Sequence, residues 1–122
     1  MRVVCVEPDK QPYEMEMPIT LEALQKAVGG YIQAVYPWDD PAAIVCNEEA
    51  KLINLPPNRA LRDPHGKLYD IICGTFLVVG LTAENFGSLT DEQAAAYIRR
   101  FRNPEAFLSI GNMHFVSTPI TH

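Results

Sequence analysis

A polar, turn-rich segment of 18 residues, positions 46–63, separates two strongly apolar, strand-like runs of this chain. The segment contains two adjacent prolines, three asparagines and six charged residues. Compact domains usually connect their strands by much shorter segments, and long polar connections on a rigid scaffold are where binding groups tend to lie. No catalytic signature accompanies the segment. It is therefore the first candidate for a binding site, and the sequence indicates no particular reaction.

The alternation of apolar and polar residues predicts an antiparallel hairpin at the start of the chain. Residues 2–6 are typical of a buried strand, and residues 13–17 alternate strictly. In the second strand we expect Tyr13, Met15 and Met17 to face the core. Further strands are predicted over residues 31–36, 42–46, 67–72 and 75–81. The last of these holds a nearly unbroken apolar run, which indicates a central strand covered on both faces.

Capping residues predict a first helix over residues 20–28. Thr20 is a typical N-cap, and Gly29 supplies the left-handed residue that often ends a helix. Apolar residues follow one another at helical spacing between these two positions.

The residues after position 81 have a helical character. Thr90 and Gln93 fit a capping box, and the apolar residues behind them predict an amphipathic helix over 91–102. Pro104 is a suitable first residue for a further short helix through Ser109. Residues 113–122 either add a strand or trail loosely.

Together these elements predict an α+β fold, with a bent, mostly antiparallel sheet of five or six strands and the helix at 20–28 packed against it. We expect residues 1–81 to form this core domain. Residues 82–122 are expected to form a helical C-terminal extension packed on the core. The chain of 122 residues is 48% hydrophobic, which is enough for one such core.

The charge balance argues against general nucleic-acid binding. The chain has 15 acidic and 10 basic residues and a formal net charge of −5, whereas such binding needs a basic stripe that neutralises phosphates. No apolar stretch approaches the roughly 20 residues that span a bilayer. The N-terminus lacks the pattern of a secretory signal. We therefore expect no membrane segment.

The cysteines and histidines predict neither a disulfide framework nor a metal site. Cys5, Cys46 and Cys73 are odd in number, lie in apolar runs and have no Cys-x-x-Cys spacing, which indicates buried free thiols in a reducing compartment. The three histidines are scattered along the chain. The sequence therefore predicts a cytoplasmic protein without a metal or another cofactor.

Several segments carry a family resemblance through their order and spacing. They are residues 21–32, 47–52, 55–58 and 70–76, with residues 86–93 behind them. The first four resemble the family called domain of unknown function 3846, and the last resembles an extension that some members carry. That family usually has glycine where this chain has Ala50. The resemblance implies a small bacterial protein, often of a phage or mobile element, and it supplies no established activity.

Four side chains at the start of the polar segment form the first group of candidate ligand-binding residues: Asn47, Glu48, Glu49 and Lys51. They admit two interpretations. In the structural one, Asn47 stabilises a turn and the glutamates project into water. In the functional one, a glutamate accepts hydrogen bonds or acts as a general base, with Lys51 as its counter-ion. Adjacent glutamates point in different directions, so they are not expected to meet one substrate together.

Asn58 and Arg59 form the second group of candidate ligand-binding residues. As structural residues they would pin the segment to its surroundings. As functional residues they would orient a polar ligand, because a guanidinium fork suits carboxylate or phosphate. Tyr31 and Trp38 are candidates for contact with a partner, although a tryptophan after a strand more often covers the edge of a core.

The leading hypothesis is a non-enzymatic binding module that recognises a protein or a small polar ligand through residues 46–63, in phage or mobile-element biology. One alternative is a small enzyme that uses Glu48 or Glu49 as base and Lys51 or Arg59 to stabilise charge. A third hypothesis is a structural domain that forms a homodimer through an exposed strand edge.

Overall fold

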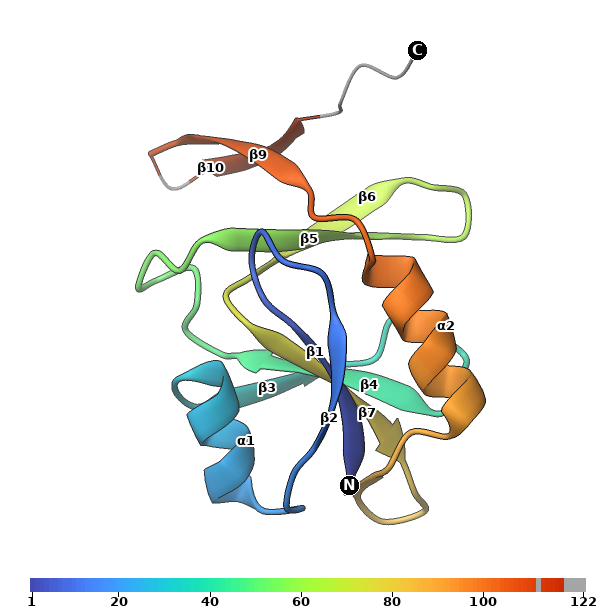
Figure 1. Ribbon diagram of the computed structural model, residues 1–122. Helices are drawn as coiled ribbons and strands as arrows, with labels where there is room; N and C mark the ends of the chain where they lie inside the picture. The colour runs from blue at the N-terminus through green and yellow to red at the C-terminus, as the bar shows by residue number, and fades with distance from the viewer. Residues whose placement is uncertain (112, 118–122) are drawn as a thin grey trace.

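An antiparallel sheet crosses the centre of the molecule and carries a helix on each face (Figure 1). The computed structural model describes residues 1–111 and 113–117. The strands of the sheet follow the order β2 (Tyr13–Glu16), β1 (Arg2–Val6), β7 (Phe76–Leu81), β4 (Ala42–Asn47) and β3 (Ile32–Val35), and the short β8 (Phe86–Gly87) pairs with β7. The fold is α+β with a mostly antiparallel sheet, as the sequence predicts.

The two faces of the central sheet pack against different helices. Alternate residues of β1, β4 and β7 point to one side, where they contact helix α1 (Leu21–Val28), and to the other, where they contact helix α2 (Asp91–Phe101). Nearly every residue of β7 is buried, because both of its faces are covered. The prediction of a doubly covered central strand is confirmed.

Both helices begin and end within a residue of the predicted bounds. The Thr20 hydroxyl accepts a hydrogen bond from the Ala23 amide, and Gly29 adopts a φ of 79° at the end of α1. Thr90 and Gln93 exchange the two hydrogen bonds of a capping box at the start of α2. The prediction for β2 is less accurate: Met17 is buried, but Tyr13 is 44% exposed because β2 is the edge strand.

The polar segment 46–63 is not one long connection, and this prediction is wrong. Residues Pro57–Arg62 form a strand, β5, which pairs with β6 (Leu68–Cys73). Pro57 is the first residue of β5, a position where a missing N–H disturbs the strand least. The connection from β4 to β5 therefore covers residues 48–56 only, and we call it the 48–56 turn.

A second hairpin replaces the short helix predicted from Pro104 to Ser109. Strands β9 (Ala106–Ile110) and β10 (Met113–Ser117) pair with each other and lie above β5 and β6 in Figure 1. The phenylalanine and β-branched side chains here favour a strand over a helix. Of the two alternatives for residues 113–122, the strand is present at 113–117, and the remaining positions lie outside the described residues.

Helix α2 belongs to the same hydrophobic cluster as the sheet. Its buried side chains Ala94, Tyr97 and Phe101 share this cluster with residues of β1, β4, β5, β6 and β7. None of the helices within residues 1–111 and 113–117 is long and apolar enough to cross a membrane.

Candidate functional site

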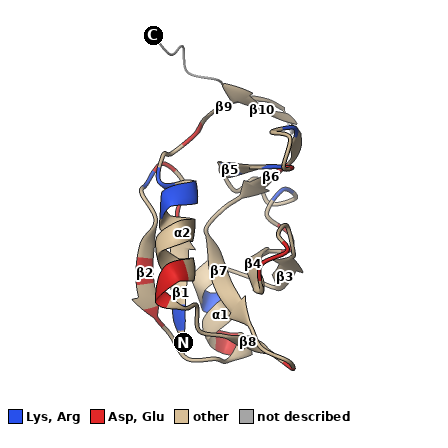
Figure 2. Cartoon of the chain, turned by 90° about the vertical axis from the view of Figure 1, so that its right-hand side faces the viewer, with Lys and Arg blue, Asp and Glu red and all other residues tan. Residues whose placement is uncertain are grey.

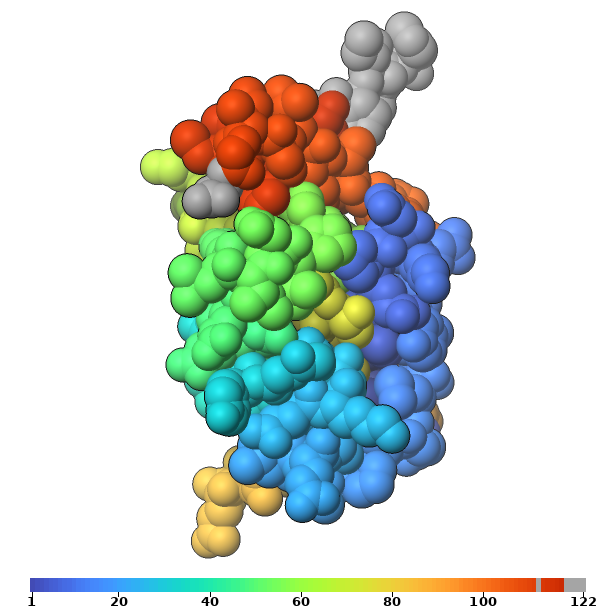
Figure 3. Space-filling view, turned by 90° about the vertical axis from the view of Figure 1, so that its left-hand side faces the viewer, coloured from blue at the N-terminus to red at the C-terminus, as the bar shows by residue number. Residues whose placement is uncertain are grey.

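Backbone hydrogen bonds hold the 48–56 turn in a fixed shape. They run from Glu48 N to Tyr31 O (2.8 Å), Ala50 N to Asn47 O (3.3 Å), Ile53 N to Glu49 O (3.0 Å), Leu55 N to Ala50 O (2.9 Å) and Gly74 N to Pro56 O (2.7 Å). Asn54 supplies the left-handed residue of the turn with a φ of 58°, a conformation that asparagine tolerates. Figure 3 shows this segment, in green, at the surface between the β9–β10 hairpin and the region of β3.

Asn47 joins the turn to helix α1. Its Nδ2 donates a hydrogen bond to the carbonyl of Val28 (3.2 Å), and its Oδ1 accepts one from the Glu49 amide (2.8 Å). Gly30 leaves room for this amide, because a Cβ at that position would lie 2.8 Å from Nδ2. Asn47 is buried, and it stabilises both the C-terminal end of α1 and the start of the turn.

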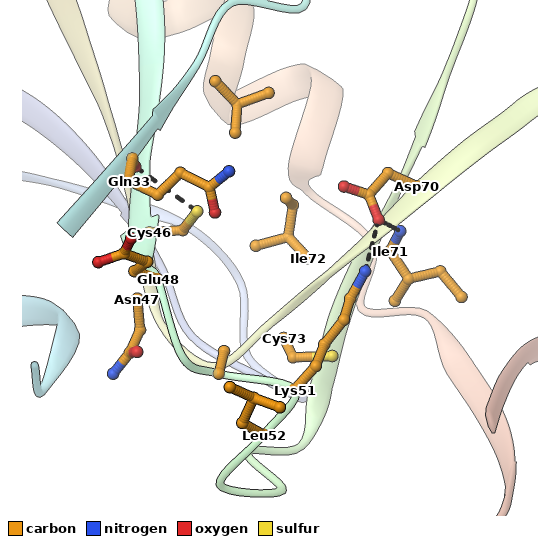
Figure 4. Close-up of a pocket in the computed structure, with 12 residues that line it drawn as sticks. Gln33, Cys46, Asn47, Glu48, Lys51, Leu52, Asp70, Ile71, Ile72 and Cys73 are labelled. Atoms are coloured by element: carbon orange, nitrogen blue, oxygen red, sulfur yellow. Dashed lines mark hydrogen bonds and ion pairs between the residues drawn. The ribbon is translucent and has the colours of Figure 1, made fainter. Parts of the chain in front are cut away.

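A recess of about 200 Å³ lies between the turn and strand β6 (Figure 4). It is lined by Gln33, Val35, Cys46, Asn47, Glu48, Ala50, Lys51, Leu52, Asp70, Ile71, Ile72 and Cys73. Figure 4 shows the side chain of Asn47 turned away from the others, whereas Lys51 reaches across toward Asp70. We call this cavity the recess.

An ion pair stands at the rim of the recess. The Nζ of Lys51 lies 2.7 Å from Oδ1 of Asp70, and both side chains are partly exposed. The same carboxylate oxygen accepts a hydrogen bond from the Ile71 amide, which fixes its position on β6. A neighbouring hollow of about 310 Å³ is also lined by Lys51 and Asp70, together with His114 of β10. The ion pair therefore stands between two hollows.

The two cysteine thiols in the wall of the recess are not activated for reaction. Cys46 and Cys73 are buried. Burial raises the pKa of Cys46 to about 11 and also raises the pKa of Cys73 above its ordinary value. Both thiols are therefore protonated near neutral pH, and neither is an activated nucleophile.

The two adjacent glutamates of the turn are exposed and line different hollows. Glu48 lines the recess, whereas Glu49 lines a separate hollow of about 260 Å³ that also includes Tyr31 and Ile53. Leu52 at the tip of the turn is 83% exposed. As expected from the sequence, Glu48 and Glu49 therefore do not contribute to the same hollow.

Asn58 and Arg59 lie away from the recess, in the interior. Asn58 Nδ2 donates hydrogen bonds to the carbonyls of Val6 and Gly74, each at 2.9 Å. Arg59 is 1% exposed. Its five N–H donors match five hydrogen bonds, which go to the oxygens of Phe101, Asn58 and Lys10. The structure thus separates this pair from the first four candidates.

The two aromatic candidates also lie apart from each other. Trp38 is partly buried and packs against α2, with its ring centroid 4.5 Å from that of Tyr97 and 6.2 Å from that of Phe101. Tyr31 is exposed beside the 48–56 turn. Trp38 therefore covers the core edge, and Tyr31 adds aromatic surface near the turn.

Asp70 and Gln33 belong to the recess and were missed in the sequence. Asp70 is an acidic residue inside the otherwise apolar strand β6, which is a usable signal. Gln33 carries no comparable signal, since it alternates with apolar neighbours as any edge residue does. Within the part of the chain that the structure describes, no three His, Cys, Asp or Glu side chains come together as a metal site.

Comparison with known proteins identifies the family of this chain. A family model described as Domain of unknown function (DUF3846) matches residues 1–102, which include the central sheet, both helices and the recess. No curated protein and no solved structure matches the chain. Because the match covers most of its length, the chain belongs to the family described as Domain of unknown function (DUF3846).

Proposed function

We propose that this protein is a non-enzymatic binding module that holds a small polar ligand in the recess. The supporting observation is the Lys51–Asp70 ion pair at the rim, which joins a turn of fixed backbone to a strand of the scaffold. Groups held in place before a ligand arrives lose little freedom on binding. A role in bacterial phage or mobile-element biology, which the family resemblance implies, is part of the proposal.

The lining of the recess favours a small zwitterion of the amino-acid type. Glu48 and Asp70 supply carboxylates that suit an ammonium group, and Lys51 supplies an ammonium group that suits a carboxylate. Lys51 has three N–H donors, of which Asp70 takes one. The volume equals about seven water molecules at roughly 30 Å³ each. A compact ligand with both charges therefore fits better than a nucleotide or a sugar chain.

The same geometry supports binding more than catalysis. The enzyme alternative needs Glu48 or Glu49 as a base, and both side chains are exposed. It also needs a cation that stabilises charge. The donors of Arg59 all bond to protein oxygens, and Lys51 is paired with Asp70. General bases in enzymes are usually tuned by burial or by close charges. The close charge pair of the recess joins Lys51 to Asp70 and involves neither of these glutamates.

Calorimetric titration with a series of free amino acids tests the proposal. We expect one or more of these compounds to bind, and Lys51→Gln or Asp70→Asn to weaken that binding about tenfold because each removes a charged contact. Lys26→Gln is the matched control, since it removes one exposed positive charge from α1. The proposal is wrong if Lys51→Gln binds the same compounds as tightly as the unaltered protein does. It is also wrong if the bound compound is chemically converted.

A protein partner is the other form of this hypothesis. Leu52 projects an apolar side chain from a fixed turn, and Ile53 and Tyr31 are exposed next to it. Exposed apolar groups on a rigid element are typical anchors for a partner. If the ligand is a protein, Leu52→Asp should abolish binding of that protein and Lys51→Gln should alter it little. These two variants therefore distinguish a protein partner from a small polar ligand.

The hairpin β9–β10 favours a second candidate function, homodimer formation. Residues 106–117 contain no Asp, Glu, Lys or Arg. Cross-strand pairs place four exposed apolar side chains on its outer face: Leu108 with Phe115, and Ile110 with Met113. Edge strands usually carry charges that prevent pairing. Two acidic chains can meet here without repulsion, and sedimentation of Phe115→Lys against the unaltered protein at several concentrations tests this candidate.

A further inference from the structure

We propose that a further cavity, lined by residues of β5, β6 and the end of α2, binds a small phosphate ester that carries a flat ring. This cavity has a volume of about 310 Å³ and lies where the C-terminal end of α2 meets the β5–β6 hairpin. Its charged and aromatic lining consists of Trp38, Arg59, Arg62, Tyr69, Arg100, Phe101 and Glu105. We call it the arginine cavity. It shares no lining residue with the recess and is independent of the function proposed above.

The arginine cavity is positively charged although the chain is acidic. Three guanidinium groups and a single carboxylate line it, whereas the whole chain has 15 acidic and 10 basic residues. Figure 2 shows the basic residues at the C-terminal end of α2, next to those of β5. A concave site with one sign of charge concentrates ligands of the opposite sign.

Arg59 contributes charge to this cavity rather than hydrogen bonds. It is buried, and its donors all bond to uncharged oxygens. Among the described residues, no carboxylate bonds to it directly, and Glu105 and Asp9 act on its charge from further away. Two of these bonds go to the carbonyl of Phe101 at the end of α2. The helix dipole there offsets roughly half an elementary charge. The rest of the charge acts through an interior where water screens it weakly.

Arg62 and Arg100 supply the hydrogen-bond donors. Arg62 lies 3.6 Å from Oε1 of Glu105, a long contact, while the other oxygen of that carboxylate is held by the Ala60 amide at 2.7 Å. Arg100 is exposed and makes no ion pair with any residue that the structure describes. Two guanidinium forks at the rim of a cavity suit the oxygens of a phosphate group.

The aromatic wall explains why a ring is part of the proposed ligand. Trp38 is held in place by Tyr97 and Phe101, and the guanidinium carbon of Arg100 lies 5.4 Å from the centre of its ring. Tyr69 of β6 is half exposed and belongs to the same lining. Flat groups gain from contact with aromatic rings and with guanidinium planes. A cavity of this size accepts one ring and one phosphate group.

The probes are phenyl phosphate, inorganic phosphate and phenol, titrated at low ionic strength with calorimetry. We expect phenyl phosphate to bind most tightly, inorganic phosphate less tightly, and phenol least. Arg62→Gln and Arg100→Gln are each expected to weaken phenyl phosphate binding about tenfold, because each removes a charged hydrogen-bond donor. Lys67→Gln and Arg99→Gln are matched controls of equal charge change that do not line this cavity, and they should bind as the unaltered protein does.

Three results would overturn the proposal. The first is equal binding of phenol and phenyl phosphate. The second is equal weakening by control and test variants, which would show only a general charge effect. The third is no binding of either phosphate at millimolar concentration by folded protein, with folding checked by circular dichroism. Lys51→Gln should leave phenyl phosphate binding unchanged, so failure here and failure of the amino-acid proposal are separate outcomes.

Discussion

Arg59 donates two hydrogen bonds to the main-chain carbonyl of Phe101, from Nε at 3.1 Å and from a terminal nitrogen at 2.9 Å. This contact joins β5 to the last residue of α2, 42 positions further along the chain. Another partner, the carbonyl of Lys10, lies in the connection from β1 to β2. One buried side chain thus holds three separate segments together.

Replacement of Arg59 should destabilise the fold strongly. Arg59→Met is expected to lower the free energy of unfolding by about 3–5 kcal/mol, because the carbonyls of Phe101 and Lys10 lose their buried donors. Urea denaturation measures the change. Arg62→Met is the control and should lower that free energy by less than about 1 kcal/mol, because its pair with Glu105 is partly exposed. Equal effects of the two substitutions would contradict this account.

The contact between Gly30 and Asn47 predicts a coupled pair of substitutions. Gly30→Ala places a Cβ 2.8 Å from the Asn47 amide and should lower the free energy of unfolding by about 1–2 kcal/mol. Asn47→Ala should lower it by about 1–3 kcal/mol, because the Val28 carbonyl loses a donor. The double variant should be less destabilised than the sum of the two, since shortening the Asn47 side chain removes the clash. Strict additivity would show that the two residues do not act on each other.

The buried thiol of Cys46 predicts a loss of stability at alkaline pH. Burial raises its pKa from 9.0 to about 11 in the folded state, so below pH 9 both folded and unfolded chains keep the proton. As the pH rises from about 9 to 11, only the unfolded chain releases it. The free energy of unfolding should therefore fall over this range, by about 2 kcal/mol for this group.

Denaturation at a series of pH values checks this prediction. The slope between pH 9 and 11 should be smaller for Cys46→Ala than for the unaltered protein. A slope remains in the variant because burial also raises the pKa of Cys73. Identical slopes in the two proteins would show that Cys46 ionises as easily in the folded state as in the unfolded one.

The fixed shape of the 48–56 turn predicts slow hydrogen exchange. The amides of Ile53, Leu55 and Gly74 each donate to a carbonyl of the turn, so they should exchange much more slowly than the same amides in an unstructured peptide. Nuclear magnetic resonance after transfer to deuterated buffer measures the rates. Exchange of all three amides at peptide rates would show that the turn is not held in one shape.

The sequence predicts the helices well because their ends depend on local chemistry. The N-caps Thr20 and Thr90 bond to amides three positions away, and Gly29 ends α1 through its own backbone conformation. Such signals lie within a few residues and need no knowledge of the rest of the fold. The core strand β7 is equally visible, since burial on both faces leaves a continuous apolar run.

Strand β5 could not be predicted from the sequence because contacts with distant segments decide its structure. Pro56 and Pro57 indicate a break, and Asn58 and Arg59 are polar, so the local pattern favours a loop. In the structure, carbonyls from other segments satisfy these two polar side chains and allow them to be buried. Strand β9 was not predicted for a different reason: Pro104 is also a suitable first residue for a helix, so the sequence there favours a short helix.

The candidate site is predictable only in part for the same reason. Glu48 and Lys51 belong to the 48–56 turn and line the recess. The side chain of Asn47 stabilises the start of that turn. The partner of Lys51 is Asp70, 19 positions away, and only the pairing of the folded segments brings these two together. No pattern within the polar segment points to that contact.

Chemical-shift mapping during a titration with free amino acids tests the central claim most directly. If the recess binds a small zwitterion, the amides of residues 48–52 and 70–73 should shift with ligand concentration, and those of helix α2, which does not line the recess, should not. In Lys51→Gln the same shifts should need about ten times more ligand, because the substitution removes a charged contact. Absence of any shift at millimolar concentration, or shifts confined to residues outside the recess, would contradict the account.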